Sequence, residues 1–560
     1  MELVIRLAGA AGQGIQTLGD ILARGLFRHG LYVHTEMSYH SRIRGGENAY
    51  TVRACTEPCA AIQEESHVLV ALSEDMLAQY SAHLAPGGYV ICDERLPAAA
   101  GEVIAVPARQ LAREELKLPI AAGTVLLGTL AGLLELDQTV LDDVVREVLG
   151  DKAAPNLRAL QMGRARSRPG PWRLGDEARR PQGGLLMSGA EGVGLGALLG
   201  GCRFLASYPM TPGTAVMAYL AQRAVDWGMV VEQAEDEIAA VNMALGAAYA
   251  GARAMVTTSG GGFALMVEGL SLAGMIETPV VFHLGQRPSP ATGLPTRTGQ
   301  ENLLFALHAG HGEFPRYIVA PRDPLDAIHL TAKAFELAEA FQVPAIVLTD
   351  QYLVDGRFTV ARPALEGRQA TNHLLSPEEL EAADSYHRFA ISETGVSPRA
   401  IPGVTSKLVL VDSDEHDEYG RITEDLAIRQ TMVEKRLRKG ERLARQVAAP
   451  VQYPPGPLAG KTVLLGWGSS HGALREAVDQ LNAPGGEFAL LHYTEIWPLR
   501  TAELERAFAE ADRVVAVEGN ATGQFAKLVA QETGRRVHSV VAKYDGRPLT
   551  ARDIVRGVER

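Results

Sequence analysis

The stretch FLASYPMTPGT, residues 204–214, places Thr211 between two prolines directly after an apolar run. Proline fixes its own φ and drives the residue before it towards extended geometry, so this segment cannot enter a helix freely. The pattern predicts a rigid elbow between a strand over 202–208 and a helix that begins near Gly213 or Thr214. Ligands bind at this carboxyl edge in open α/β sheets, although a stiff turn without chemistry also explains the elbow.

Acidic residues cluster ahead of an alanine-rich helix in VVEQAEDEIAAVNMALGAAYAGA. Glu232, Glu235 and Asp236 fit the ordinary preference for acids in a helix's first turn. Glu237 differs, because the residues four and seven positions after it are apolar and place it at the mouth of a buried stripe. A carboxyl group there is expected to have a raised pKa and to bind a specific partner.

Two further segments of this region follow predicted strands. In MVTTSGGGFALM, the glycines Gly261 and Gly262 with Phe263 would let a flat ligand approach the backbone. In VVFHLGQRPSPATGLPTRTGQ, Arg287 at a strand's carboxyl end suits a carboxylate ligand, and Thr296 lies in the loop beyond it. A surface arginine is the alternative interpretation.

Near the amino terminus, the turn Gly12-Gln13-Gly14 lies between the strand VIRLAG and a predicted helix. Backbone N–H groups at a helix start attract phosphate. Arg42 and Arg44 follow in SYHSRIRGGENAY and favour a phosphate-rich ligand.

A nicotinamide dinucleotide is the competing ligand for this turn. Glu36 falls where a ribose-binding acid is expected, but Thr17 stands where the fingerprint requires its third glycine. A structural glycine turn with surface arginines explains the same residues, so all three interpretations stay open.

Composition narrows the class of protein. With 560 residues, three or four domains are expected, and the net charge of −12 argues against a nucleic-acid partner. The four cysteines, Cys55, Cys59, Cys92 and Cys202, are too few and too scattered for an iron–sulfur cluster or a disulfide framework. No secretory leader is apparent, and GTVLLGTLAGLLEL is too short to span a bilayer. We therefore expect a cytoplasmic protein that binds no membrane and holds no metal of its own.

Strands alternating with helices predict an α/β protein with parallel sheets and right-handed crossovers. The expected organisation is an α/β domain over 1–160, a linker over 161–182, a second α/β domain over 183–355, a polar connecting segment over 356–458 and a third α/β domain over 459–560. In the third, GWGSSHG is a candidate anion-binding loop.

The sequence resembles the 2-oxoacid:ferredoxin oxidoreductases. SYPMTPGT, the Glu237 helix, TTSGGGFALM and QRPSPATGLPTRTGQ look like the alpha subunit, and GAAGQGI with RIRGG resembles the gamma domain. ISETGVSPRAIPG and SDEHDEYGRITED extend the resemblance over nearly the whole chain. It implies a fused gamma–alpha subunit with a Rossmann-like gamma domain, a thiamine pyrimidine-binding domain and a transketolase C-terminal-like domain.

The resemblance also implies roles for individual residues. Glu237 matches the glutamate that hydrogen-bonds N1′ of the thiamine diphosphate aminopyrimidine. Thr211, Arg287 and Thr296 match positions that hold the 2-oxoacid. The reaction is oxidative decarboxylation to acyl-CoA and CO2 with reduction of ferredoxin, and the gamma domain is the candidate coenzyme A site.

The chain lacks the Gly-Asp-Gly that thiamine enzymes use to anchor Mg²⁺ and diphosphate. The resemblance therefore implies a partner beta subunit that carries Mg²⁺, the diphosphate site and a [4Fe-4S] cluster, in a dimer of heterodimers.

We favour 2-oxoglutarate as substrate, with pyruvate or a branched-chain 2-oxoacid as alternatives, and the reverse reductive carboxylation stays open. A nicotinamide-dependent oxidoreductase and a non-catalytic assembly subunit are the rivals from other classes.

Overall fold

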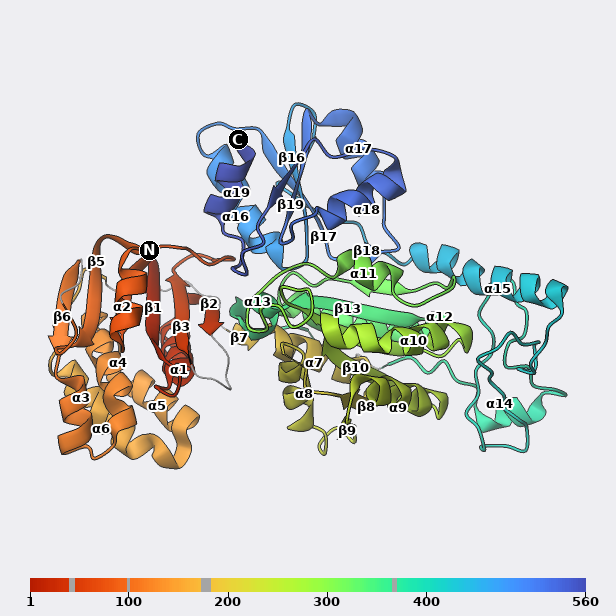
Figure 1. The fold of residues 1–560 in the computed structure, drawn as a ribbon, viewed down its shortest axis with the longest axis horizontal. Coiled ribbons are helices and arrows are strands. Elements are labelled where there is room, and N and C mark those ends of the chain that lie inside the picture. The colour runs from red at the N-terminus through yellow and green to blue at the C-terminus, as the bar shows by residue number, and fades with distance from the viewer. Residues whose placement is uncertain (40–45, 98–100, 173–182, 365–369) are drawn as a thin grey trace. The chain divides into compact units, whose positions relative to one another are not determined.

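The computed structural model describes residues 1–39, 46–97, 101–172, 183–364 and 370–560 (Figure 1). These divide into two compact units: Met1–Ser188 with Asp355–Arg362, and Gly189–Val354 with Pro363–Arg560. Arg42 and Arg44 lie outside the described residues.

The first unit is built on an eight-stranded sheet. Its strands, in spatial order, are β6 (Glu102–Val106), β5 (Leu84–Asp93), β4 (Ser66–Ala71), β1 (Glu2–Ala10), β3 (Glu47–Cys55), β2 (Tyr32–Tyr39), β14 (Arg357–Val360) and β7 (Leu185–Ser188). The first four are parallel, as predicted, whereas β3 and β2 are antiparallel to their neighbours. Only seven residues separate β2 from β3, too few for a crossover helix, so this pair must reverse direction.

Helices of the first unit cover this sheet. They are α1 (Ile15–Arg28), α2 (Glu74–Ser81), α3 (Ala108–Gln110), α4 (Ala122–Leu133), α5 (Gln138–Leu149) and α6 (Ala153–Arg164). The helices α1 to α4 pack on its strands, and α5 and α6 pack against α1 and α4. In α1 the buried Ile15, Leu18 and Leu22 recur at helical spacing. A Cβ at Gly128 of α4 would lie 2.1 Å from the Leu160 carbonyl oxygen, so glycine permits the close packing of α4 on α6.

A seven-stranded sheet forms the centre of the second unit. Its order is β18 (Glu495–Trp497), β12 (Tyr317–Val319), β13 (Pro344–Asp350), β11 (Val280–Gln286), β10 (Arg253–Ser259), β8 (Cys202–Ser207) and β9 (Val230–Gln233). All are parallel except β18, which is antiparallel to β12. The chain runs from β8 to β9 on one side and then to β10 on the other, so the strand order reverses between β8 and β10. Ligands of open α/β sheets bind at such a point.

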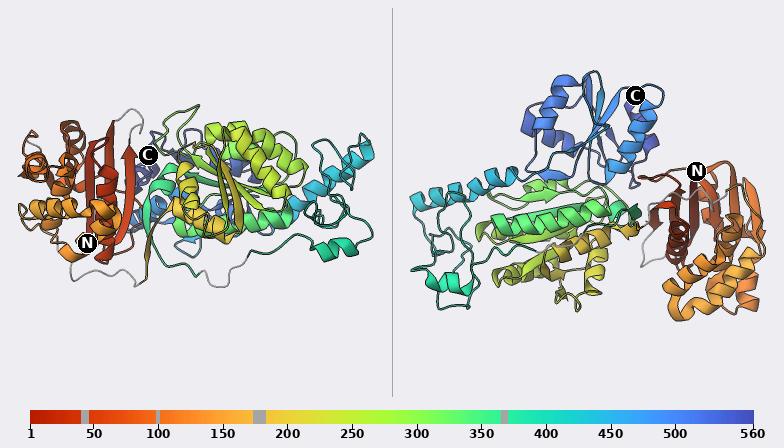
Figure 2. Two further views of the ribbon diagram at one scale, coloured as in Figure 1. Left: turned by 90° about the horizontal axis from the view of Figure 1, so that it is seen from below. Right: turned by 180° about the vertical axis from the view of Figure 1, so that it is seen from behind.

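Helices cover both faces of this sheet. On one face α7 (Gly189–Leu199) packs against α12 (Pro324–Phe341), and on the other α9 (Glu237–Tyr249) packs against α10 (Gly260–Met275) (Figures 1 and 2). The short helices α8 (Thr214–Ala221), α11 (Leu303–His308) and α13 (Gln351–Asp355) follow β8, β11 and β13 along the chain.

The carboxyl-terminal part of the second unit forms a five-stranded sheet. Its order is β15 (Val451–Tyr453), β17 (Phe488–Tyr493), β16 (Thr462–Trp467), β19 (Arg513–Glu518) and β20 (Ser539–Ala542), with α16 (His471–Asn482), α17 (Ala502–Glu510), α18 (Gln524–Thr533) and α19 (Ala551–Val558) around it. Trp467 and Phe525 belong to the same buried cluster as Ile346 and Leu348 of β13. The two sheets of this unit therefore share one apolar core.

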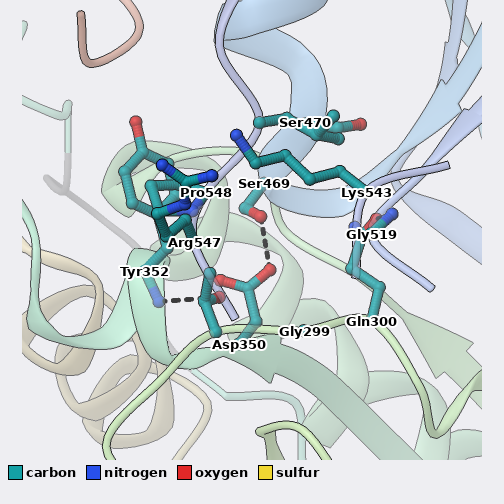
Figure 3. A pocket seen from close by; sticks show the side chains of 12 residues that line it. Gly299, Gln300, Asp350, Tyr352, Ser469, Ser470, Gly519, Lys543, Arg547 and Pro548 are labelled. Atoms are coloured by element: carbon teal, nitrogen blue, oxygen red, sulfur yellow. Dashed lines mark hydrogen bonds between the residues drawn. The ribbon is translucent and has the colours of Figure 1, made fainter. Parts of the chain in front are cut away.

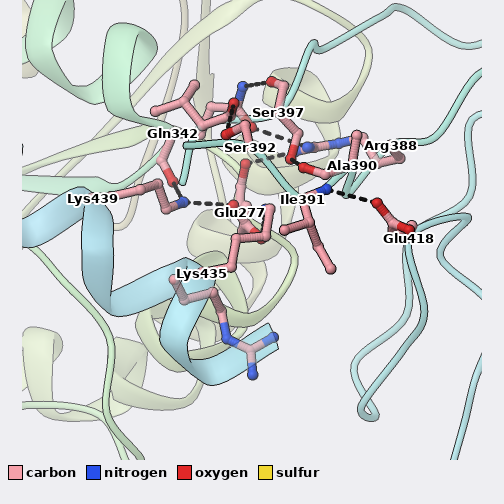
Figure 4. Close-up of polar contacts among 12 residues, drawn as sticks. Glu277, Gln342, Arg388, Ala390, Ile391, Ser392, Ser397, Glu418, Lys435 and Lys439 are labelled. Atoms are coloured by element: carbon pink, nitrogen blue, oxygen red, sulfur yellow. Dashed lines mark hydrogen bonds and ion pairs between the residues drawn. The ribbon is translucent and has the colours of Figure 1, made fainter. Parts of the chain in front are cut away.

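The polar segment between them is anchored by a buried ion cluster (Figure 4). It contains α14 (Pro377–Ala382) and α15 (Leu426–Ala444). Lys435 and Lys439 of α15 place their Nζ atoms 2.7 and 2.6 Å from the two carboxylate oxygens of Glu277, and all three side chains are buried. Burial acts to raise the pKa of Glu277, but the two lysines and Arg388 overcome it and hold that pKa well below its usual range. Such a cluster fixes the segment to the domain because any member left alone would be a buried unpaired charge.

Candidate active site

The proline elbow lies at the carboxyl end of β8, where the strand order reverses. β8 ends at Ser207 and α8 begins at Thr214, so the predicted strand, elbow and helix are confirmed. The carbonyl oxygen of Thr211 accepts a hydrogen bond from Nη1 of Arg287 at 2.8 Å. The structure thus brings together two residues that the sequence placed at the ends of separate strands.

Arg287 directly follows β11 and is 6% exposed. Burial lowers the pKa of its guanidinium. One of its nitrogens is held by the elbow, and a buried arginine favours a further anionic partner. Thr296 is half-buried in the loop that follows.

Glu237 is the first residue of α9 and is 4% exposed. The helix is capped by Asp236, whose side chain accepts from the Ala239 amide at 2.7 Å. Within the described part of the chain, its Oε1 has no hydrogen-bond partner. Burial, with a smaller contribution from the charge of Asp236, raises the pKa of this carboxyl. A buried carboxyl with an unsatisfied oxygen fits a group that receives a hydrogen bond from a ligand.

The triple glycine forms the first turn of α10, beside this carboxyl. A Cβ at Gly262 would lie 2.4 Å from Glu237 Oε1 and 2.1 Å from Thr258 Oγ1, so only glycine fits there. At Gly261 the nearest atom would be Met210 Cε at 3.8 Å, so the backbone is open on that side. Met210 belongs to the elbow, and the elbow and the glycine turn are therefore neighbours.

Two further polar atoms at this turn lack a partner. Ser259 Oγ and Asn302 Oδ1 are buried without a hydrogen bond among the described residues, and Asn302 lies against Gly260. Together with Glu237 they form a set of polar groups of the kind that a polar heterocycle such as an aminopyrimidine would satisfy.

Phe263 lies elsewhere than the sequence suggested. Its ring is fully buried and makes edge-to-face contacts with Phe282 and Phe305, with centroids 5.9 and 5.3 Å apart. The aromatic that follows the glycines points into the core because it occupies the inner face of α10. Its contribution there is packing, which corrects the expected ligand contact.

In the first unit, the glycine turn borders a cavity of about 360 Å³ at the carboxyl ends of β1, β4 and β5. Gly12 and Gln13 line it, and Gly14 caps α1 in the left-handed conformation. Arg109 and Arg113, which were not predicted from the sequence, also line this cavity. Their signal was the run AVPARQLAREE, which places two arginines directly after the strand β6.

Arg109 is held in place by its neighbours. Its Nη2 donates to the Leu72 carbonyl at 2.9 Å, and its amide donates to Asp93 at 2.7 Å. Arg113 has an exposed side chain at the cavity's edge. The walls include Pro119, Ile120 and Leu126, so the cavity combines apolar surface with two cations.

A second cavity lies between the two sheets of the second unit (Figure 3). Its volume is only about 30 Å³, enough for about two water molecules. Ser469 of the GWGSSHG loop donates to the buried carboxylate of Asp350, and Gln300 donates to the Trp467 carbonyl at 3.0 Å. Burial raises the pKa of Asp350, with Ser469 acting in the opposite direction. This loop therefore links the two sheets through hydrogen bonds. The cavity is too small for the anion-binding site that the sequence suggested.

Among the described residues, no group of three or more His, Cys, Asp or Glu side chains is arranged to hold a metal ion. Within the same part of the chain, no helix is both long and apolar enough to cross a bilayer.

Known families match three consecutive parts of the chain. "Pyruvate ferredoxin/flavodoxin oxidoreductase" matches residues 4–166, "Pyruvate flavodoxin/ferredoxin oxidoreductase, thiamine diP-bdg" matches 195–435, and "Pyruvate:ferredoxin oxidoreductase core domain II" matches 460–554. The fold and these matches are thus those of a thiamine-dependent oxidoreductase subunit.

Individual relatives define the family more closely. The alpha subunit of a 2-oxoacid:ferredoxin oxidoreductase from Sulfolobus sp is 30% identical, covering 98% of this chain and 95% of that protein. An alpha subunit from Aeropyrum pernix is 35% identical over 78% of this chain and 70% of its own length. The structure of 2-oxoglutarate:ferredoxin oxidoreductase from Magnetococcus marinus, with 2-oxoglutarate, coenzyme A and succinyl-CoA bound, is 32% identical, with a TM-score of 0.91 over 100% of this chain and 99% of that one. The chain belongs to the 2-oxoacid:ferredoxin oxidoreductase family and corresponds to its alpha subunit.

Proposed function

We propose that this alpha subunit, assembled with a beta subunit, oxidatively decarboxylates 2-oxoglutarate to succinyl-CoA and CO2 and passes the electrons to ferredoxin. The observation that carries the proposal is the buried Glu237 carboxyl beside Gly262, with an oxygen that no described residue satisfies. The Magnetococcus marinus structure is named for 2-oxoglutarate, and 2-oxoglutarate synthase subunits from Archaeoglobus fulgidus and other organisms are among the relatives, at modest identity. Pyruvate and branched-chain 2-oxoacids are the alternative substrates.

The residues of the second unit would hold the pyrimidine half of thiamine diphosphate. When bound, thiamine diphosphate would supply the nucleophilic carbon and the electron sink that decarboxylation of a 2-oxoacid requires. Glu237 would hold a proton between its carboxyl and N1′ of the pyrimidine, and its raised pKa suits that exchange. The open backbone at Gly261 leaves room for a flat ring to approach the turn.

Arg287 and Thr211 would orient the 2-oxoacid, with Thr296 completing the pocket. The guanidinium of Arg287 can donate two parallel hydrogen bonds to a carboxylate. Its hydrogen bond to the Thr211 carbonyl fixes the orientation of the guanidinium plane. The Thr211 hydroxyl would add one donor beside it. Arg287→Lys should therefore raise the KM for the 2-oxoacid more than it lowers kcat, because an ammonium cannot reproduce a bidentate contact.

Coenzyme A would bind in the first unit, in the cavity bordered by Gly12, Gln13, Arg109 and Arg113. The helix start at Gly14 and the two arginines suit phosphates, and the apolar wall suits an adenine ring or a pantetheine arm. Arg42 and Arg44 stay candidate phosphate contacts on sequence grounds. The nicotinamide alternative predicts tight binding of NAD(H) instead.

The beta subunit would supply Mg²⁺, the diphosphate site and the [4Fe-4S] cluster, in a dimer of heterodimers. Coexpression with that subunit, followed by a panel of 2-oxoacids with a viologen acceptor and coenzyme A, tests the proposal. We expect the highest kcat/KM with 2-oxoglutarate and an iron-free, inactive chain when it is purified alone. Stoichiometric iron in the lone chain, or no activity with any 2-oxoacid in the iron-loaded complex, would refute it.

A further inference from the structure

A chain of buried hydrogen bonds crosses three neighbouring strands of the second sheet and ends at the proline elbow. Thr257 of β10 and His283 of β11 are 2.7 Å apart, between Oγ1 and Nδ1. The other ring nitrogen of His283, Nε2, lies 2.8 Å from Oγ1 of Thr349 on β13. At the opposite end, Thr257 Oγ1 lies 3.1 Å from the carbonyl oxygen of Gly213, two residues after Thr211. Each of these three side chains is at most 2% exposed.

The direction of every bond in this chain follows from the carbonyl at its Gly213 end and from the neutral imidazole. The Gly213 carbonyl can only accept, so the hydroxyl of Thr257 must donate to it. That hydroxyl oxygen must then accept from Nδ1–H of His283. A neutral imidazole has one N–H, so Nε2 must accept from the hydroxyl of Thr349. Burial lowers the pKa of His283 to about 3, which keeps the ring neutral near pH 7.

The elbow is clamped from the same side by other contacts. A Cβ at Gly285 would lie 2.8 Å from Pro212 Cγ, so β11 and the proline are in close contact. Ser207 donates to the Thr257 carbonyl at 2.7 Å, which links the end of β8 to β10. The chain through His283 adds a side-chain hydrogen bond to the peptide between Gly213 and Thr214, and nothing in the proposed chemistry uses His283 directly.

We propose that His283 is a positioning residue, which holds Thr257 on the Gly213 carbonyl and thereby sets the direction in which Thr211 meets the 2-oxoacid. This inference rests on the proposed role of Thr211. It assigns to a buried histidine an effect on substrate binding rather than on proton transfer.

The test uses the enzyme assembled with its beta subunit and compares two replacements of the ring. His283→Leu removes the donor to Thr257 while it keeps an apolar side chain of similar size. His283→Asn keeps an N–H donor near the position of Nδ1. We expect His283→Leu to raise the KM for the 2-oxoacid about tenfold, the scale of one buried hydrogen bond, with kcat and the affinity for thiamine diphosphate changed less than about twofold. His283→Asn should restore most of that loss.

Two controls make the result specific. His492→Leu replaces a fully buried histidine of β17, in the other sheet of this unit, and should leave the KM unchanged even if it lowers the melting temperature. Thr257→Val removes the hydroxyl at almost constant volume and should reproduce the KM of His283→Leu, so it carries the test if the leucine variant does not fold.

The outcomes separate this inference from the proposed function. An unchanged KM in His283→Leu and Thr257→Val, with a raised KM in Thr211→Val, refutes the positioning role alone. An unchanged KM in Thr211→Val as well refutes the substrate pocket itself. If His283→Leu and His283→Asn both lower the fraction of active enzyme by the same amount and leave the KM unchanged, His283 only supports the fold and the positioning role is refuted.

Discussion

The glycine-rich turns that begin α1 and α10 use glycine for different reasons. At α1, Gly12 and Gly14 have φ values of 87° and 75°, and a Cβ at either would meet nothing within 4 Å. At α10, the glycines have ordinary φ values, but a Cβ at Gly262 would collide with Glu237 and Thr258. The first turn requires glycine for its backbone conformation, and the second requires it for space.

This difference separates the two sites chemically. The α1 turn leaves its backbone exposed beside a cavity of about 360 Å³, which suits a ligand with phosphates. The α10 turn presses against a buried carboxyl and fixes where that carboxyl can lie. We therefore expect changes at α10 to affect catalysis strongly and changes at α1 to affect ligand affinity moderately.

The largest effect is expected for Glu237→Gln, which tests the carboxyl that the α10 turn holds. Proton exchange at the thiamine C2 should slow by about a hundredfold or more, the usual scale for a positioned acid or base. Hydrogen–deuterium exchange at C2 in the assembled enzyme measures it. Glu268→Gln, at an exposed glutamate on α10, is the matched control and should leave the exchange rate unchanged.

The same variant should not lose stability. Burial raises the pKa of Glu237, so the ionised carboxylate is disfavoured in the folded state at pH values above that raised pKa. This penalty disappears as the pH falls below the unfolded value, and glutamine does not carry it at any pH. The melting temperature of Glu237→Gln should therefore equal or exceed that of the parent at pH 7 and converge with it in acid. A clear loss of stability at pH 7 would contradict this account.

Gly262→Ala is the next largest change, and Gly261→Ala is its matched partner in the same turn. The Cβ at Gly262 must displace Glu237 or Thr258, so both stability and kcat should fall, kcat by about tenfold if one buried hydrogen bond is lost. Gly261→Ala meets only ordinary contacts within the chain and should keep the parental melting temperature. If the pyrimidine ring of thiamine diphosphate packs on the Gly261 backbone, Gly261→Ala should also raise the concentration of thiamine diphosphate needed for activity. Identical behaviour of the two variants would show that the turn is not built as described.

Sequence and structure agree most closely where local chemistry decides. The prolines around Thr211 predicted the elbow, and the apolar neighbours of Glu237 predicted its burial. Side-chain contacts between adjacent strands could not be predicted, because they depend on the order of the strands in the sheet. The contacts of His283 with Thr257 and Thr349 arise only because β10, β11 and β13 are adjacent. Phe263 was misjudged because the sequence after a glycine run does not show which face of the new helix is inner.

Arginine replacement in the first unit should have a smaller effect than either change at α10. Arg113→Ala removes an exposed cation from the cavity's edge and should raise the KM for coenzyme A several-fold, with the largest effect at low salt. Arg146→Ala removes an exposed arginine of α5 that does not line the cavity, and should leave that KM unchanged. The double variant Arg42→Ala, Arg44→Ala tests the sequence-based candidates in the same assay. Reduction of the cluster by the 2-oxoacid without coenzyme A should stay normal in all three.

The smallest change, Gly12→Ala, separates backbone strain from ligand contact at the α1 turn. A non-glycine residue at a φ of 87° costs about 1–2 kcal/mol, so the variant should be less stable. Gly87→Ala is its control, because Gly87 in β5 has a φ of 73° and an equally open Cβ position but does not line the cavity. Thermal unfolding should show similar losses in the two variants. Only Gly12→Ala should also raise the KM for coenzyme A, because only there would the new methyl group and the altered amide direction meet the ligand. Equal KM values in both variants would remove the α1 turn from the coenzyme A site and leave its glycines with a purely conformational role.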